Sequence, residues 1–183
     1  MVDDVRLVRG ASNARRFFDR LAPWYDRINA RIYKPEWREK ARAALRGRVL
    51  DVGVGTGFTT GHLEGAVGLD LSWEMLRRAR YAGELVRGNF LSPPLRANTF
   101  DTIVFAGSFY YLDDAMKGLR IARELLRDSG RVVVLSPATR WLGLAVPVHS
   151  DQDYRSLFDS TGFTLESYER LNWAACLVIA RKT

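Results

Sequence analysis

Three glycines in alternate positions, preceded by an acid, follow the first strongly apolar stretch of the chain. They lie in the segment Val49-Leu50-Asp51-Val52-Gly53-Val54-Gly55-Thr56-Gly57. Glycine lets a ligand approach the backbone closely and adopts conformations that other residues resist. Where such a loop joins a strand to a helix, it is typical of a cofactor site. The alternative is a tight turn between strand and helix that holds no ligand.

The residues after the glycines argue against two common classes of cofactor. A dinucleotide loop needs another small residue at position 58, to seat a pyrophosphate on the helix N-terminus. That position is Phe58. A phosphate-binding P-loop ends in Gly-Lys-Ser or Gly-Lys-Thr, and this ending is absent from the loop. The sequence therefore favours a different cofactor.

A second acid follows Asp51 at a distance of 19 positions, in the segment Gly68-Leu69-Asp70-Leu71-Ser72. A carboxylate at the end of a second strand can accept hydrogen bonds from both hydroxyls of a ribose. Taken alone, Asp70 could be an acid that the helix dipole favours at a helix start. Its distance from the glycine loop favours the ribose interpretation.

Together the two segments resemble motif I and the acidic second strand of class I S-adenosylmethionine-dependent methyltransferases. The resemblance implies that Asp70 binds the ribose, and that Leu71 and Met75 form walls around the adenine. It also implies that Asp51 and the loop flank the amino-acid end of the cofactor. The loop residues concerned are Val52, Gly53, Gly55, Thr56 and Gly57.

Two later segments extend this resemblance. Arg87–Phe90 is similar to a Gly-Asp-Ala segment of the family whose Asp meets the adenine amino group. Here the residue is Asn89, which can accept a hydrogen bond but without charge, so that the contact is weaker. Phe90 is expected to stack on the adenine. Asn98–Asp101 matches the entry to the family's fourth strand.

After that strand, Ala106 and the segment Gly107–Leu112 are expected under the methyl donor, with Ser108 in contact with the cofactor. Within it, Tyr110 and Tyr111 are candidate catalytic residues or simply packing residues. His149 is a candidate general base or an ordinary polar loop residue. Cys176 is expected to be a small core residue rather than a nucleophile.

The N-terminal segment Phe18–Asn29 is similar to the opening of the UbiE-like, methyltransferase type 11 family, which acts in ubiquinone and menaquinone biosynthesis. This resemblance places Tyr25 near the mouth of the cofactor site. Ser160–Phe163 and the final strand are also similar. Two departures bear on the acceptor: Tyr110-Tyr111 replaces an Arg-Asn pair, and Ser136–Ser150 is shorter than the family's insert.

Short apolar segments that alternate with amphipathic ones must position these residues. We predict helical segments over residues 12–46, interrupted near Pro23 and Pro35 and capped by Gly47. Further helices are predicted at Phe58–Leu63, from Ser72 to Arg80, at Asp113–Arg127 with Gly130 closing it, and at Asp151–Ser160. The predicted strands are Arg48–Val52, Ala66–Asp70, Glu84–Arg87, Thr102–Ala106, Arg131–Leu135, Phe163–Tyr168 and Ala174–Arg181.

This alternation predicts an α/β fold: a single Rossmann-like, doubly wound sheet of about seven mostly parallel strands, with helices on both faces. In such sheets ligands bind beyond the carboxyl ends of the strands. The 183 residues suffice for one domain. We expect residues 1–46 to form a helical lid and residues 47–183 the cofactor-binding unit.

The excess positive charge lies entirely in the N-terminal segment. The chain has a net charge of +7; residues 1–48 contain 13 Lys or Arg and 6 Asp or Glu, whereas residues 49–183 contain 15 of each. Such a segment can bind an anionic membrane surface or RNA. The alternative is a solvated helical face that has no partner.

The composition of the sequence also bears on where in the cell the protein is expected. No apolar run approaches the roughly 20 residues of a membrane span, and the first residues lack the apolar region of a secretory signal. One cysteine allows no internal disulfide. We therefore expect a cytoplasmic protein that is able to lie at a membrane surface.

The predicted reaction is transfer of a methyl group by in-line displacement to a small aromatic, quinone-like or lipid-like acceptor. S-adenosylmethionine would be the donor, S-adenosylhomocysteine the product, and no metal is expected. Two alternatives stay open. One is an RNA or protein methyltransferase that uses the basic segment, and the other is a module that binds the cofactor without turnover.

Overall fold

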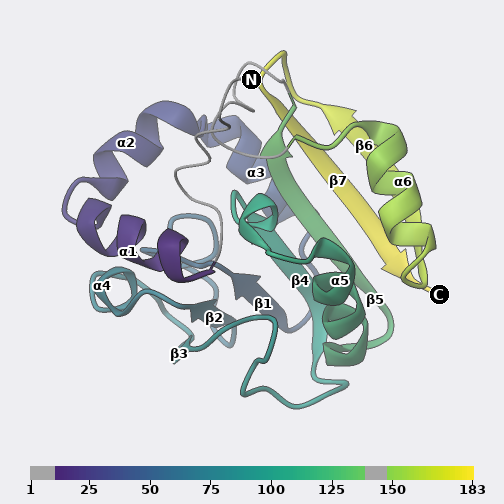
Figure 1. Ribbon diagram of the computed structural model, residues 1–183, viewed down its shortest axis with the longest axis horizontal. Helices are drawn as coiled ribbons and strands as arrows, with labels where there is room; N and C mark the ends of the chain where they lie inside the picture. Colours follow the sequence, from purple (N-terminus) through teal and green to yellow (C-terminus); the bar gives the residue numbers. More distant parts are fainter. Residues whose placement is uncertain (1–10, 139–147) are drawn as a thin grey trace, which may run out of the picture.

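Seven strands form one sheet in the computed structural model, which describes residues 11–138 and 148–183 (Figure 1). The spatial order is β3-β2-β1-β4-β5-β7-β6. Strands β1 to β5 run parallel, and β7 is antiparallel to both β5 and β6. The strands are β1 (Val49–Val52), β2 (Val67–Asp70), β3 (Glu84–Arg87), β4 (Phe100–Ala106), β5 (Leu126–Pro137), β6 (Phe163–Arg170) and β7 (Ala175–Lys182).

Helices precede and connect these strands. They are α1 (Ala11–Leu21), α2 (Tyr25–Ile32), α3 (Pro35–Ala43), α4 (Trp73–Leu76), α5 (Ala115–Leu125) and α6 (Asp151–Asp159), with a 3₁₀ turn η1 (Phe109–Tyr111). The α/β class, the mostly parallel sheet and its seven strands confirm the prediction. The predicted interruptions near Pro23 and Pro35 are also confirmed, because α1, α2 and α3 are separate helices.

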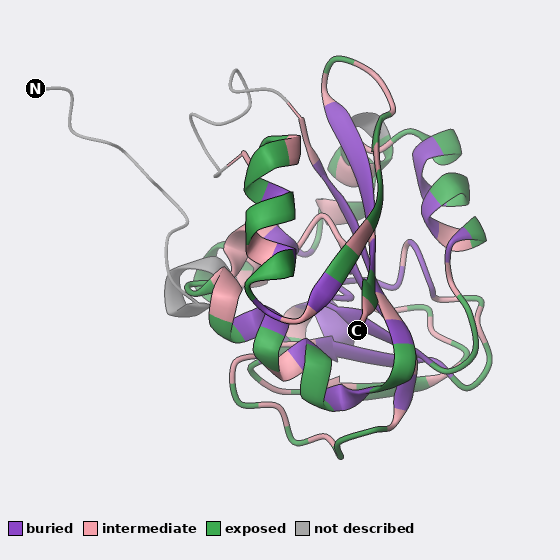
Figure 2. Cartoon of the chain, turned by 90° about the vertical axis from the view of Figure 1, so that its right-hand side faces the viewer, coloured by how far each residue is buried: buried purple, intermediate pink, exposed green. Residues whose placement is uncertain are grey.

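Alternating residues of the central strands supply two hydrophobic cores, one on each face of the sheet. On β4, Ile103 and Phe105 pack with α5 and α6, while Val104 packs on the opposite face with Trp37 and Ala41 of α3. All of these side chains are buried, as the purple stretches along the central strands show (Figure 2). Because these strands are buried on both faces, their sequences are continuous apolar runs.

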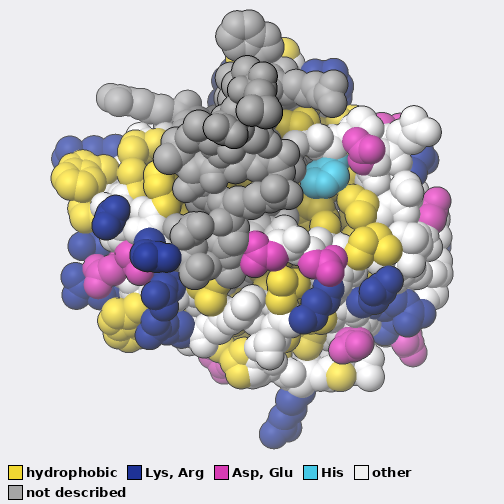
Figure 3. Space-filling model, viewed as in Figure 1, with side chains coloured by type: hydrophobic (Ala, Val, Ile, Leu, Met, Phe, Trp, Pro, Cys, Tyr) yellow, Lys and Arg dark blue, Asp and Glu magenta, His cyan; other side chains and the backbone are white. Residues whose placement is uncertain are grey.

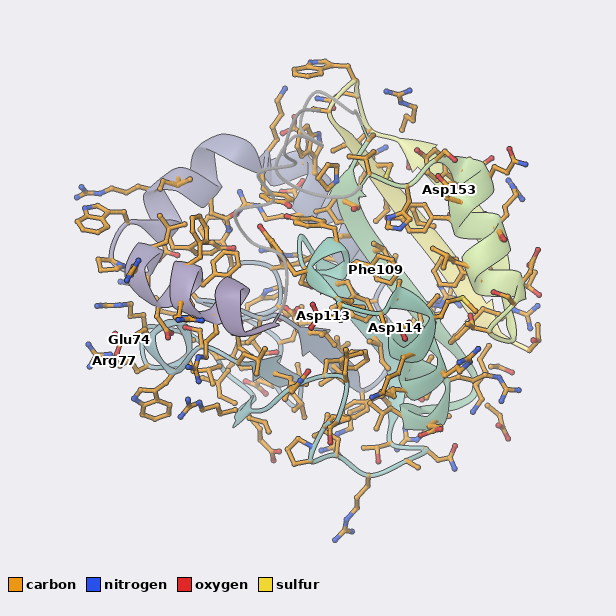
Figure 4. The ribbon with its side chains drawn as sticks, in the orientation of Figure 1. Glu74, Arg77, Phe109, Asp113, Asp114 and Asp153 are labelled. Atoms are coloured by element: carbon orange, nitrogen blue, oxygen red, sulfur yellow. The ribbon has the colours of Figure 1, made fainter. Side chains whose placement is uncertain are left out.

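Side-chain caps set the start of the helices around the carboxyl ends of the strands. The carboxylate of Asp114 accepts the Lys117 N–H at the start of α5. At α6, Ser150 and Asp153 exchange the two hydrogen bonds of a capping box. Figure 4 labels Asp114 and Asp153 at these two helix starts. Ser72 accepts the Met75 N–H and starts α4 in the same way.

The helix predicted at Phe58–Leu63 is wrong, because the structure has turns there. Arg42 of α3 donates from Nε to the carbonyl oxygen of Thr59, at 2.6 Å, and from Nη2 to that of Phe58, at 3.0 Å. A continuing helix would need both oxygens for its own N–H groups. A tertiary contact has therefore replaced the local helix.

Two predicted helix ends are also wrong. The helix after Ser72 ends at Leu76 rather than Arg80, since the chain then turns back and the Arg80 N–H donates to the Thr56 carbonyl oxygen at 3.1 Å. Gly130 does not close α5. That helix ends at Leu125, and Gly130 lies within β5, which starts at Leu126.

In the part of the chain that the structure describes, no helix has both the length and the apolar character needed to cross a bilayer.

Candidate functional site

A cavity opens at the carboxyl ends of β1, β2 and β4, where the fold predicts a ligand. Eleven of the residues expected at the site line it: Tyr25, Val52, Gly53, Gly55, Asp70, Leu71, Met75, Asn89, Phe90, Ser108 and Tyr111. Residues from α2, from the loop after β1, from the end of β2 and α4, and from the segments after β3 and β4 thus meet around one space. The topology explains this meeting, because parallel strands present their carboxyl ends at the same edge.

The glycine loop forms one wall of the cavity. Gly53 has a φ of +70°, and a Cβ built there would lie 2.5 Å from the Cβ of Ser108. Its N–H donates to the Leu69 carbonyl oxygen at 2.8 Å, and the Ser108 hydroxyl donates to the Val52 carbonyl oxygen. Glycine at 53 is therefore required both by conformation and by the close approach of the two strand ends.

Asp70 lies at the centre of the hydrogen bonding that holds this wall. Its Oδ2 accepts the Gly55 N–H and its Oδ1 the Ser72 N–H, each at 2.8 Å. Burial raises the pKa of the Asp70 carboxyl, and the N–H groups of Ser72 and Gly55 partly oppose this effect. Each carboxylate oxygen can accept two hydrogen bonds, so the side chain that faces the cavity fits a vicinal diol such as a ribose.

Asp51 lies behind the loop and does not line the cavity. It is 2% exposed, and its Oδ2 accepts the hydroxyl of Thr60 at 2.5 Å. Its Oδ1 has no hydrogen-bond partner among the described residues. Burial raises the pKa of Asp51 to about 7, with a further contribution from the charge of Asp70. A buried oxygen without a partner is costly, which fits a position that a cationic or hydrogen-bonding group completes.

Thr56, Gly57 and Ala106 are the other expected cofactor residues that do not line the cavity. The Thr56 hydroxyl donates to Asp26 of α2 at 2.5 Å. A Cβ at Gly57 would lie 2.8 Å from the Arg80 carbonyl oxygen, so this glycine admits the chain segment that follows α4.

The far end of the cavity is apolar. Leu71 and Met75 line it together with Phe90, whose ring packs edge to face on Phe105 with centroids 5.3 Å apart. Asn89 also lines it, but its Oδ1 already accepts the Leu91 N–H at 2.9 Å. The amide retains one further acceptor position and both donors. These side chains fit a flat heterocycle with a polar edge.

Aromatic rings from α1 and α2 cover the cavity. Phe18 packs edge to face on Tyr25 and on Tyr111, with centroids 5.9 Å and 5.2 Å apart. Two carboxylates hold these helices to the cofactor wall: Asp26 accepts from Thr56, and Asp19 accepts from the Ser72 hydroxyl. Both contacts join segments far apart in the sequence.

The remaining candidate residues lie beyond this cover. Tyr110 does not line the cavity; its hydroxyl is 3.2 Å from that of Tyr33. His149 is partly buried, packs against the rings of Phe109 and Tyr154, and has a pKa lowered by burial. Cys176 is fully buried and burial raises its pKa to about 11, which confirms its place in the core.

Gly107 and Leu112, from the segment expected under the methyl donor, also line the cavity, whereas sequence reasoning missed Arg15, Phe18, Leu69, Ser72, Gly88, Leu91 and Asp113. Asp113 is labelled beside η1 in Figure 4. Ser72 could have been predicted to line the cavity, because it follows Asp70 by two positions. Arg15 and Phe18 could not, since their place depends on how α1 docks. Within the described ranges, no three His, Cys, Asp or Glu side chains gather as a metal site would require.

Comparison with known proteins agrees with this geometry. The family described as "Methyltransferase domain" matches residues 50–134. A demethylmenaquinone methyltransferase of Thermotoga maritima is 32% identical over 67% of this chain and 61% of its own length. A 2-methyl-6-phytyl-1,4-hydroquinone methyltransferase of Oryza sativa is 29% identical over 86% of this chain and 52% of its own length. The chain thus spans less than two thirds of each of these relatives.

A solved structure from Thermotoga maritima has the same fold, with a TM-score of 0.76 and 20% identity over 92% of this chain and 98% of that one. It is described as an S-adenosylmethionine-dependent methyltransferase and possible histamine N-methyltransferase. The sheet order, the glycine loop beside Asp70 and these matches converge. They identify residues 50–134 as a methyltransferase domain and support a class I S-adenosylmethionine-dependent methyltransferase of the UbiE-like, methyltransferase type 11 kind.

Proposed function

We propose that the protein transfers a methyl group from S-adenosylmethionine to a small aromatic, quinone-like or lipid-like acceptor. One observation carries the proposal: the cavity at the carboxyl ends of β1, β2 and β4 is lined by both the glycine loop and Asp70. Asp70 would bind the ribose, Leu71 and Met75 the adenine, and the loop near Asp51 the amino-acid end. When bound, S-adenosylmethionine supplies a methyl group that is already activated.

The residues of the chain then contribute position and shelter rather than acid-base chemistry. Gly53 and Ser108 hold the ends of β1 and β4 together, which aligns the donor with the space beneath η1. The rings of Phe18, Tyr25 and Tyr111 cover that space and exclude water. Alignment and a dry site account for large rate effects in a displacement reaction.

The lining of the cavity supports an apolar acceptor. Its lining includes the apolar and aromatic side chains of Phe18, Leu91, Tyr111 and Leu112, with Arg15 and Asp113 as charged residues of opposite sign. Rings and aliphatic side chains favour a flat, weakly polar molecule over a charged polymer, because a buried charge needs a partner. The names of the two relatives, which specify a menaquinone precursor and a hydroquinone, support the same acceptor class.

The outer face of α1, α2 and α4 supports a lipid source for that acceptor. Exposed fractions are 42% for Phe17, 58% for Trp24, 37% for Ile28 and 55% for Trp73. Arg20 and Arg27 are also exposed. Figure 3 shows hydrophobic and basic side chains along its left-hand edge, with a few acidic ones among them, where these helices lie in Figure 1.

Asp19 of α1 and Asp26 of α2 accept hydrogen bonds from the hydroxyls of Ser72 and Thr56, and Asp26 also stays exposed to solvent. Arginines beside exposed tryptophans match an anionic bilayer surface, where aromatic rings lie at headgroup level. We propose that α1 and α2 act as a lid that docks on such a surface. RNA binding by the same face is the alternative.

Isothermal titration with S-adenosylhomocysteine tests the cofactor assignment, with NADH as the control. We expect S-adenosylhomocysteine to bind and NADH to give no heat at the same concentration. Methyl transfer is then measured with labelled S-adenosylmethionine and 2-prenyl-1,4-naphthohydroquinone as acceptor. Binding of NADH alone would overturn the cofactor assignment. Binding of S-adenosylhomocysteine without methylation of quinol, RNA or protein would favour a module without turnover.

A further inference from the structure

Four tyrosine side chains converge beside the cavity, at the carboxyl end of β4. They are Tyr25 of α2, Tyr33 just after that helix, and Tyr110 and Tyr111 of η1. The hydroxyls of Tyr33 and Tyr110 lie 3.2 Å apart. The rings of Tyr110 and Tyr111 are in contact, with centroids 4.4 Å apart. Tyr111 and Tyr25 line the cavity, whereas Tyr33 and Tyr110 form a second row behind them.

Gly107 brings this second row against the cavity wall. It lines the cavity, has a φ of +81°, and a Cβ built on it would lie 2.4 Å from the Tyr33 hydroxyl oxygen. The hydroxyl therefore occupies the space where any other residue would carry its side chain. The pair Tyr33–Tyr110 thus lies directly beside the backbone that precedes Ser108 and η1.

Two further hydroxyls lie behind the pair without hydrogen-bond partners among the described residues. Tyr154 of α6 is fully buried and Ser136 of β5 is 1% exposed. The ring of Tyr154 packs against that of Phe109 in η1, with centroids 5.9 Å apart, which places it beside the segment that carries Tyr110. Ser136 directly follows Leu135, whose carbonyl oxygen accepts the Gly107 N–H at 2.9 Å.

Unsatisfied buried hydroxyls are unusual in a folded protein and need an explanation. Packing does not require them here, because phenylalanine and alanine would fill nearly the same volumes without the desolvation penalty. Hydroxyls from α6 and β5 lie behind a tyrosine pair from α2 and η1. Their common feature is the capacity to donate to, and accept from, an uncharged oxygen.

We propose that these hydroxyls, led by the pair Tyr33–Tyr110, form the subsite that receives an oxygen substituent of an aromatic acceptor. The acceptor class is a phenol, quinol or quinone, held by its oxygen with its ring against Tyr111. This inference rests on the proposed function and assigns to it positioning residues for the acceptor. Tyr33 and Tyr110 position the ring; they take no part in the cofactor site.

The electrostatic setting of the pair selects for neutral oxygen. Burial raises the pKa of Tyr33 and of Tyr110, so both phenols are protonated and uncharged near neutral pH. Uncharged hydroxyls can share protons with a carbonyl or hydroxyl oxygen. They cannot compensate an ammonium ion for its lost hydration. An amine acceptor is therefore disfavoured.

Binding of 1-naphthol and of naphthalene to the full chain separates the oxygen from the ring. Both ligands are titrated by calorimetry with and without saturating S-adenosylhomocysteine. We expect the wild type to bind 1-naphthol about tenfold more tightly than naphthalene. Tyr33→Phe and Tyr110→Phe remove only the hydroxyls, and each should lower that ratio to about threefold or less. Thr164→Val, which removes an exposed hydroxyl near the start of β6, is the control and should keep the ratio.

The affinity for S-adenosylhomocysteine should stay within about twofold in all three variants, because neither Tyr33 nor Tyr110 lines the cofactor cavity. A wild type that does not distinguish the two ligands would overturn the subsite. So would Tyr33→Phe and Tyr110→Phe variants that retain the wild-type ratio. If the wild type does not bind S-adenosylhomocysteine, the proposed function is contradicted. The ratio of 1-naphthol to naphthalene affinity, measured without the cofactor, tests the subsite separately.

Discussion

At the end of β2, each oxygen of Asp70 accepts one backbone N–H, from Gly55 or from Ser72. These bonds fix the plane of the carboxylate before any ligand arrives. A preorganised acceptor loses little conformational freedom on binding, and its hydrogen bonds to a diol are correspondingly effective. The same two bonds join the glycine loop to the start of α4. Asp70 therefore has both a structural and a ligand-binding role.

Replacement of Asp70 by Ala should weaken S-adenosylhomocysteine binding by at least about tenfold, since charge-assisted hydrogen bonds are worth roughly 1.5–3 kcal/mol each. Calorimetric titration measures the loss. Glu74→Ala is the control, because its carboxylate lies on the outside of α4, paired with Arg77 at 2.9 Å (Figure 4). If a folded Asp70→Ala variant binds S-adenosylhomocysteine normally, Asp70 acts only as an acid at the start of a helix and does not bind the cofactor.

Asp51 gives a prediction about pH. In the folded protein its pKa is raised to about 7 from an ordinary value of 3.8, chiefly by burial. Between these values the folded state keeps a proton that the unfolded state releases. Stability from this group is therefore full below about pH 4, falls as pH rises, and levels off above about pH 7.

Asp51→Asn removes this dependence. Urea unfolding at pH 4.5 to 7.5 should show the variant gaining stability relative to the wild type as pH rises, by on the order of 4 kcal/mol at most. Thr60→Val, which removes the hydroxyl that donates to Asp51, should extend the decline in stability to higher pH, because that hydrogen bond holds the pKa of Asp51 down. Parallel pH curves for wild type and Asp51→Asn would contradict the assignment.

At the scale of elements, α1 and α2 differ from the helices that pack on the sheet. Their side chains contribute to the cover of the cavity, whereas Trp37 and Ala41 of α3 belong to the core beneath β5 and β7. Asp19 and Asp26 attach α1 and α2 through single hydrogen bonds to Ser72 and Thr56. A cover that is attached at a few points can open at a smaller cost in free energy than unfolding of the sheet requires.

The double variant Asp19→Ala, Asp26→Ala should release this cover without unfolding the sheet. We expect faster amide exchange in α1 and α2 and unchanged exchange in β4 and β5, measured by mass spectrometry. Affinity for S-adenosylhomocysteine should fall several-fold, because Arg15, Phe18 and Tyr25 lose their positions at the cavity. Equal protection in both proteins would show that other contacts hold the helices.

Reversal of Arg20 and Arg27 to Glu tests the lipid surface. Binding to vesicles rich in phosphatidylglycerol should weaken by about tenfold or more, since each basic residue near an anionic bilayer contributes about 1 kcal/mol. The paired control reverses Arg96 and Arg120, which are exposed on other parts of the molecule, and should leave sedimentation with vesicles unchanged. Strong, salt-dependent binding to RNA and none to vesicles would favour the nucleic-acid alternative.

At the scale of the whole molecule, a ligand that binds only the folded state must raise its stability. At about one hundred times its dissociation constant, S-adenosylhomocysteine should add roughly 2.7 kcal/mol. This corresponds to a rise in Tm of about 5–10 °C for a chain of this size. Differential scanning fluorimetry measures the shift. Stabilisation by NADH and not by S-adenosylhomocysteine would refute the cofactor assignment.

Most of the fold could be predicted because local pattern and tertiary context agree. The strands β2 to β7 begin and end within a few residues of their predicted bounds, with the long start of β5 as the exception. Buried apolar runs account for this in β2, β4 and β7, whereas β3 and β6 are largely exposed. The Phe58–Leu63 segment failed for a non-local reason. Its carbonyl groups are bound by Arg42, which lies 16 and 17 positions earlier.

The same distinction, between residues placed by local sequence and residues placed by tertiary contacts, applies to the site. Asp70, Gly55 and Ser108 could be predicted because a loop at a strand end has its position set by the sheet. Tyr33 could not, since its hydroxyl reaches the site only across the 77 positions that separate it from Tyr110. Gly107 carried a usable signal, because a glycine directly after a buried strand often marks a close approach.

The reversed order of the last two strands sets the sequence of events as the protein is made. Strands β2 to β5 can each pair with a strand already synthesised, but β6 has its sheet neighbour in β7, which follows it in the chain. Until β7 emerges from the ribosome and pairs with both β5 and β6, the edge of β5 stays open and β6 has no place in the sheet. A chaperone that shields exposed strand edges would act at this stage.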